Sequence, residues 1–278
     1  MSGSNPELRM LNYKQDWRSV VFVIVCLGLI LLPYRIDIPA SYTPVCLMLA
    51  GLFCFCVCII NHNHVHTATF QQAALNRLFG VLLTLAKGHT SAGVILAHNY
   101  NHHVYNGKSN DWIRPELAGN GPGIIRLIRF IINSVVSMTR GKREQVDKVL
   151  PVEIVRQMRL ERIALFTFIV FLVVLDMRTF LMFVLIPWMT GVLLLIGVNL
   201  LQHDKCEPDS AYNHSRNFTS KLGNWFFFNN GYHTAHHMYP GLHWSELPDL
   251  HHRKVVPFID KRLDKKSIMS FMIKNYTL

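Results

Sequence analysis

The sequence predicts an all-α integral membrane protein, with four transmembrane helices in two hairpins and a cytoplasmic helical cap that carries clustered histidines. Half of the 278 residues are apolar, and much of that half lies in a few long runs. A helix needs roughly 20 apolar residues to cross a bilayer, and the runs approach this length. Nine of the 15 histidines cluster at the ends of those runs or outside them. We expect one domain over residues 1–278.

The first hairpin is predicted from apolar runs at about residues 18–34 and 41–60. The segment between them is a short polar turn with two prolines, Pro33 and Pro39, which a continuous helix would not keep. The first run is long enough to span and lacks a small-residue cleavage site. It is therefore expected to remain in the mature protein.

The second hairpin is predicted from runs at about residues 160–175 and 179–201. Asp176 and Arg178 separate them, and charged side chains are costly at bilayer depth but natural in a turn at its surface. Pro187 is expected to kink the second arm of this hairpin.

A fifth span over residues 78–97 is suggested by hydropathy, but we interpret this segment as a helix on the cytoplasmic face. A crossing here would put Lys87 at the bilayer centre and move the next histidine cluster to the opposite side. Residues 124–138 carry Arg126 and Arg129 among apolar residues, a pattern typical of an amphipathic helix in the membrane plane. The predicted cap thus comprises residues 61–159 and 202–278.

Charge indicates the orientation of this topology. Of the 28 Lys and Arg residues, all except Arg35 and Arg178 fall on the side of the cap and both termini. The positive-inside rule makes that side cytoplasmic, in a bacterial inner membrane or the endoplasmic reticulum. The net charge of +11 comes with no nucleic-acid-binding motif, so no nucleic acid partner is expected. Anionic lipid head groups and an acidic redox partner fit the charge better.

The histidine clusters indicate a metal centre. Neutral imidazole is a common ligand for transition metals, and i,i+4 spacing places two side chains on one helix face. Nine imidazoles are too many for one ion, so two metal ions are predicted. Calcium and magnesium are excluded because Asp204 is the sole acid adjacent to a candidate ligand. A dizinc hydrolase stays open, although iron with O2 fits better. The candidate ligands are His62, His66, His98, His102, His103, His203, His233, His236 and His237.

These spaced clusters, together with Asn199 one turn before His203, resemble the integral-membrane fatty acid desaturase superfamily, which includes alkane and fatty-acyl hydroxylases. The resemblance runs from about residue 20 to residue 260 and includes both hairpins. It implies two iron ions held by the nine histidines, O2 as co-substrate, and a fatty acyl substrate taken from the membrane. It also implies that Asn199 contacts one iron through water.

Several polar residues outside the set of candidate ligands have predicted roles of their own. His214 and Asp204 are candidates for hydrogen bonds to ligand imidazoles, and His214 and His243 stay open between that role and a structural one. The other four are predicted to lie at the surface: His64, His89, His251 and His252.

The resemblance favours desaturation, the introduction of a carbon–carbon double bond into a fatty acyl chain. A fatty acyl or alkane hydroxylase and a decarboxylase that forms a terminal alkene remain alternatives. The chain holds no nicotinamide fingerprint, no cysteine quartet and no haem domain, so a separate ferredoxin, rubredoxin or cytochrome is expected to supply electrons. From another class, a histidine-rich metal transporter is disfavoured because the span interiors are nearly free of ionisable residues.

Overall fold

The computed structural model describes residues 10–277 and shows a chain that is mostly helical. Three helical segments are long and apolar enough to cross a membrane, namely Lys14–Tyr34, Thr43–His66 and Met177–His203. These three coincide with the first, second and fourth predicted spans. The predicted single domain also included residues 1–9 and 278, which lie outside the described residues.

The first hairpin consists of α1 (Trp17–Leu31), a 3-10 turn over Leu32–Tyr34, and α2 (Thr43–His66). Pro44 sits in the first turn of α2, where its missing N–H costs no hydrogen bond. The helix continues past residue 60, the predicted end of this span, because no helix-breaking residue occurs before Thr67. His62 and His66 therefore lie on the last turns of this candidate spanning helix.

The second hairpin begins with α7 (Val152–Leu175), which is followed by α8 (Met177–Phe180) and α9 (Ile186–His203). The predicted turn is present, because the Asp176 carboxylate accepts hydrogen bonds from the backbone N–H groups of Arg178 and Thr179 and caps α8. The N-terminal half of α7 carries five charged residues, so α7 does not meet the composition of a span. The fourth span stays a prediction.

Pro187 changes the geometry of the chain just before it. Residues Leu181–Leu185 form a π-helical turn between α8 and α9. Proline lacks an N–H and its ring clashes with the preceding turn, which favours such a local widening.

Residues 78–97 do not form one helix. The chain folds into α3 (Ala73–Lys87) and α4 (Gly93–Ala97), and Gly88 ends α3 in a left-handed conformation with φ of 76°. Lys87 is buried at this break and its ammonium donates to the carbonyl of His89 at 2.6 Å. The break excludes a fifth span made of this segment.

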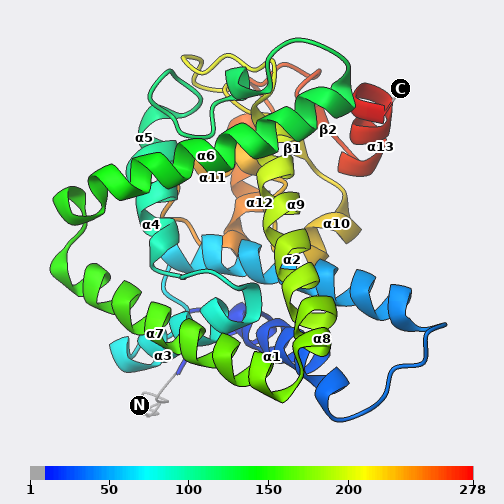
Figure 1. The fold of residues 1–278 in the computed structure, drawn as a ribbon. Helices are drawn as coiled ribbons and strands as arrows, with labels where there is room; N and C mark the ends of the chain where they lie inside the picture. Colours follow the sequence, from blue (N-terminus) through cyan, green and yellow to red (C-terminus); the bar gives the residue numbers. More distant parts are fainter. Residues whose placement is uncertain (1–9, 278) are drawn as a thin grey trace, which may run out of the picture.

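Residues 124–138 belong to the amphipathic helix α6 (Gly123–Val149), which packs against α4 and α9 (Figure 1). One face carries exposed Ile128 and Ile132, whereas Phe130 and Ser134 are fully buried. The predicted helix is therefore present and amphipathic. Its position relative to a bilayer stays a prediction.

Two glycines let the candidate spanning helices α2 and α9 cross closely. A Cβ atom on Gly191 would lie 2.8 Å from the backbone carbon of Cys54, and one on Gly51 would lie 2.9 Å from the Thr190 methyl group. Small residues at such a crossing are typical of helix packing in membranes. Because α2 and α9 both end in candidate metal ligands, this crossing fixes the distance between them.

Replacing Gly191 with leucine is expected to separate α2 from α9 and to destabilise the protein by about 1–3 kcal/mol, the usual cost of overpacking. Gly28 on α1 is the matched control, because a Cβ there meets nothing within 4 Å. Thermal unfolding of both leucine variants in the same detergent measures the difference. Equal unfolding temperatures would contradict the assigned crossing.

The remainder of the chain forms short elements around the ends of α2 and α9, and the predicted cap arrangement stays a prediction. One small departure from the all-α prediction is a two-residue parallel strand pair. Buried Asp16 joins the N-terminal segment to this region, because its carboxylate accepts from Trp244 Nε1 at 2.9 Å. The elements are α5 (His103–Tyr105), β1 (Asn217–Phe218), α10 (Lys221–Phe226), α11 (His233–Met238), α12 (Leu247–Leu250), β2 (Asp264–Lys265) and α13 (Ile268–Met272).

Candidate metal centre

The structure brings all nine predicted histidines together and sorts them into two groups. Within each group, one ligating atom per residue lies within 4.8 Å of every other. We call them the five-histidine group and the four-histidine group. The first comprises His62, His66, His98, His103 and His236, and the second comprises His102, His203, His233 and His237.

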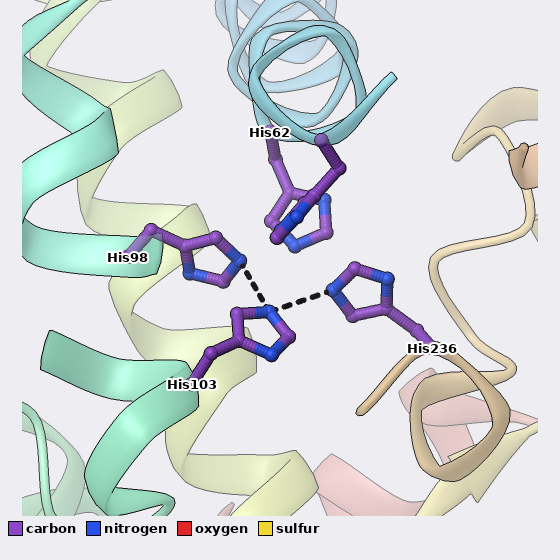
Figure 2. A group of neighbouring side chains, drawn as sticks. His62, His98, His103 and His236 are labelled. Carbon is purple, nitrogen blue, oxygen red and sulfur yellow. Dashed lines mark hydrogen bonds between the residues drawn. The ribbon is translucent and has the colours of Figure 1, made fainter. Parts of the chain in front are cut away.

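Rings of the five-histidine group converge from several separate elements. Figure 2 shows His62 from α2, His98 and His103 from the segment around α5, and His236 from α11 pointing at a common centre. The Nε2 atom of His103 lies 3.0 Å from the Nε2 atoms of both His98 and His236. His66, on the same face of α2 as His62, completes the group.

The ring nitrogens of the four-histidine group also lie close to one another. His233 Nε2 lies 2.8 Å from His203 Nε2 and 3.1 Å from His237 Nε2. Asn199, one turn before His203 on α9, places its Nδ2 atom 3.4 Å from His102 Nε2. The Asn199 Oδ1 atom is buried and has no hydrogen-bond partner among the described residues. Asn199 thus borders this group, as the sequence predicts.

These distances fit two transition-metal ions. Nitrogens bound about 2.1 Å from one ion at right angles lie about 3 Å apart, close to the observed spacings. A neutral ring nitrogen offers one proton or one lone pair, so hydrogen bonds alone satisfy three converging nitrogens poorly. His66 Nε2 is buried with no hydrogen-bond partner among the residues described. A cation would accept a lone pair from each nitrogen.

Burial also sets the protonation state that a metal needs. Burial, reinforced by the neighbouring imidazoles, lowers the pKa of His98, His233, His236 and His237 well below the ordinary value. The pKa of His103 is lowered for the same reasons. The rings are therefore neutral at pH 7, and a neutral imidazole is the form that binds a metal ion.

The assignment of histidines to groups differs from simple i,i+4 pairing. His98–His102 form a π-helical turn, whose i→i+5 hydrogen bonds bring residues five apart into line. His98 therefore shares its group with His103, while His102 turns toward the other group. On α11 the i,i+4 pair is His233 and His237, and His236 belongs to the five-histidine group.

Sequence reasoning missed Asp111. This carboxylate is fully buried, and its Oδ2 atom lies 2.8 Å from His102 Nδ1. Burial alone would raise the pKa of Asp111, but His102 and backbone hydrogen bonds hold that pKa below its ordinary value. The carboxylate accepts a hydrogen bond from the Nδ1–H group of His102. The Nε2 atom of this ring therefore keeps its lone pair, which is available to the four-histidine group. The available signal was a lone acid in the loop that directly follows the second histidine cluster.

Asp204, the acid that was predicted from its position next to His203, makes its carboxylate hydrogen bonds to other residues and not to a candidate ligand. Its carboxylate accepts two hydrogen bonds from Arg126, at 2.6 and 2.9 Å, and one from Tyr276 at 2.6 Å. These contacts tie the end of α9 to α6 and to the C-terminal segment. His214 lies nearer the site, with its ring centroid 5.7 Å from that of His237 and its Nε2 unpartnered among the described residues.

The other histidines lie outside the two groups. His243 has a structural partner, since its Nε2 atom lies 3.2 Å from Asp16 Oδ2. The predicted surface position is wrong for His251, which is fully buried 3.3 Å from Asp264 Oδ1 because the π-helical turn over His251–Val255 turns it inward. His252 is exposed as predicted, whereas His64 and His89 are half-buried.

A pair of polar side chains holds α11 in register. The Asn217 Oδ1 atom accepts from the backbone N–H of Thr234 at 2.9 Å, and Asn217 Nδ2 donates to Thr234 Oγ1 at 3.0 Å. Both residues are fully buried. Because Thr234 follows His233 directly, this contact fixes the start of the helix that contributes three candidate ligands.

An apolar cavity of about 150 Å³ adjoins both groups. Its wall includes His62 and His98 from one group and His233 from the other. Asn199 and apolar residues of α9 complete much of the lining. A molecule in this cavity would contact histidines of both groups.

Comparison with known proteins agrees with this geometry. The family model for fatty acid desaturases matches residues 40–265, most of the chain, and this range includes all nine histidines. Among curated proteins, no significant sequence match was found. Because the family match covers far more than half of the sequence, the resemblance drawn from the histidine clusters is confirmed, and the protein belongs to the fatty acid desaturase family.

Proposed function

We propose that the protein is a membrane-bound diiron enzyme that uses O2 to introduce a double bond into a fatty acyl chain. Family membership makes it an oxidoreductase of the fatty acyl desaturase and hydroxylase type. The observation that carries the finer proposal is the apolar cavity that adjoins both histidine groups. In this proposal the nine histidines hold two iron ions and Asn199 contacts one of them through water. The irons, when bound, supply the capacity to oxidise an unactivated C–H bond.

The chain's own residues position the substrate. Val192, Leu195 and Val198 of α9 present an apolar wall to the cavity, which excludes water and aligns a hydrocarbon chain. Loss of hydrogens from two adjacent carbons gives an alkene, whereas oxygen insertion at one carbon gives an alcohol. Placement of the chain decides between the two products. A hydroxylase and an alkene-forming decarboxylase are the alternatives on this scaffold.

Four spans, with both termini and the metal centre in the cytoplasm, complete the proposal. The three apolar helices support a membrane location, and the apolar second half of α7 supports a fourth span. Electrons would come from a separate ferredoxin, rubredoxin or cytochrome that docks on the basic cytoplasmic face.

Expression together with a ferredoxin and its reductase, followed by mass spectrometry of total lipids, tests this function. We expect fatty acyl chains two hydrogens lighter than their precursors, and no incorporation of label from ¹⁸O2 into them. Cells expressing the His102→Ala variant are the control and should lack the product. A labelled alcohol would identify a hydroxylase instead, and metal uptake without any new lipid would identify a transporter.

A further inference from the structure

A lysine shares the cavity with the candidate metal ligands. Lys142 on α6 lines the same 150 Å³ space as His62, His98 and His233, in a wall that is otherwise mostly apolar. The side chain is half-buried. No carboxylate lies within 4 Å of its ammonium among the residues that the structure describes. Partial burial of a cation without a counter-ion is unfavourable, and an anionic ligand in the cavity would offset this cost.

The position of Lys142 is fixed by the residue before it. Gly141 is buried against the indole ring of Trp112, so closely that a Cβ atom would collide with the ring. The backbone N–H of Trp112 in turn donates to Asn101 Oδ1 at 2.8 Å. Helix α6 is therefore anchored beside the histidine-bearing segment, and Lys142 is held at the cavity.

Other polar groups of the cavity are already engaged. His89 Nδ1 donates to the Lys87 carbonyl at 3.1 Å, which leaves Nε2 of this ring as an acceptor when it is neutral. Gln202 Nε2 donates to the Asn230 carbonyl at 2.9 Å. Burial and the neighbouring Arg162 lower the pKa of Lys142, and an anionic partner would relieve both effects. Lys142 is thus the donor in this space best suited to an anion.

We propose that Lys142 binds the free carboxylate of an unesterified fatty acid inside the cavity that adjoins the two histidine groups. A carboxylate is small enough to enter this space of about 150 Å³ and carries the charge that Lys142 lacks a partner for. The choice of ligand rests on the proposed function. With the carboxylate held there, the carbons nearest the candidate metal sites are those close to the carboxyl end.

A second cavity next to the first is the candidate site for the hydrocarbon tail. It measures about 230 Å³, is almost wholly apolar, and shares Val198, Gln202 and Asn230 with the first. Its wall includes Leu52 of α2 and exposed Lys266 near α13. Lys266 is the competing cation, because a carboxylate bound there would reverse the direction of the chain.

Binding of ¹⁴C-labelled dodecanoate and dodecanol to the iron-loaded protein in lipid nanodiscs, measured by equilibrium dialysis against empty nanodiscs, tests this inference. The wild type should bind dodecanoate more tightly than dodecanol. Lys142→Met should weaken dodecanoate binding by about tenfold to a hundredfold and leave dodecanol binding unchanged, since only the charged hydrogen bond is lost. Lys142→Arg should retain most of the affinity, and Lys266→Met should bind both ligands like the wild type.

Dodecanoate binding that is equally tight in Lys142→Met, or that is lost in Lys266→Met instead, would overturn the inference. If Lys142→Met binds neither ligand, Lys142→Arg decides, because recovery of dodecanoate binding supports the inference and continued loss overturns it. The assay requires no turnover. A protein that oxidises lipids but binds dodecanoate independently of Lys142 therefore refutes this inference alone and leaves the proposed function standing.

Discussion

Replacing His237 with alanine is expected to abolish turnover and to lower the bound iron from two ions per chain toward one. His237 belongs to the four-histidine group, so three imidazoles would remain there. An iron ion prefers about six ligands, and a site reduced to three protein nitrogens holds it weakly. The ring also packs 4.4 Å from that of His103, so its loss opens the boundary between the two groups.

The same change at His236 gives a matched comparison. His236 belongs to the five-histidine group, where four imidazoles would remain. We expect turnover to be lost in this variant too, because the proposed chemistry needs both ions, but more iron should stay bound than in His237→Ala. His252→Ala is the surface control, since His252 is exposed and belongs to neither group.

Iron per chain, measured by elemental analysis of purified protein, and product formation together check these expectations. Full activity with two irons in His237→Ala would show that the four-histidine group is not a metal site. Loss of iron in His252→Ala to the same extent would show that the effect is not specific to the groups.

Convergence of the nine histidines could be predicted because it depends on topology. The clusters lie next to the ends of apolar runs or outside them, and a membrane restricts those ends to its two surfaces. The predicted turn at Asp176 followed from charge in the same way. Such signals are local and strong. The break at Gly88, in contrast, was not predicted and divides the expected single helix into α3 and α4.

The division of the histidines between two groups could not be predicted, because it depends on helix type. A π-helical turn over His98–His102 aligns residues i and i+5 instead of i and i+4. The amino-acid sequence of this segment is compatible with either kind of turn. Asp111 was missed for a related reason. Its hydrogen bond to His102 spans nine residues through a loop whose path the sequence does not specify, whereas Asp204 was chosen only for adjacency to His203.

Replacing Asp111 with asparagine is expected to weaken iron binding at the four-histidine group by about tenfold to a hundredfold, the usual effect of losing a hydrogen-bond partner of a ligand. The Asp111 carboxylate accepts hydrogen bonds from three groups, namely His102 Nδ1–H and the backbone N–H groups of Gly107 and Ile113. An asparagine amide has one NH2, which must then face a donor. If it faces His102, the ring proton moves to Nε2 and the lone pair directed at the group is lost.

Asp209→Asn is the matched control, because Asp209 is exposed and pairs only with Lys108 among the described contacts. Mössbauer spectroscopy of ⁵⁷Fe-loaded protein separates a positioning role from a purely structural one. His102 belongs to one group only, so Asp111→Asn should alter the signal of one iron and leave the other unchanged. Equal loss of both signals, together with a lower unfolding temperature of the iron-free protein, would mean that Asp111 acts by holding the loop rather than by orienting His102.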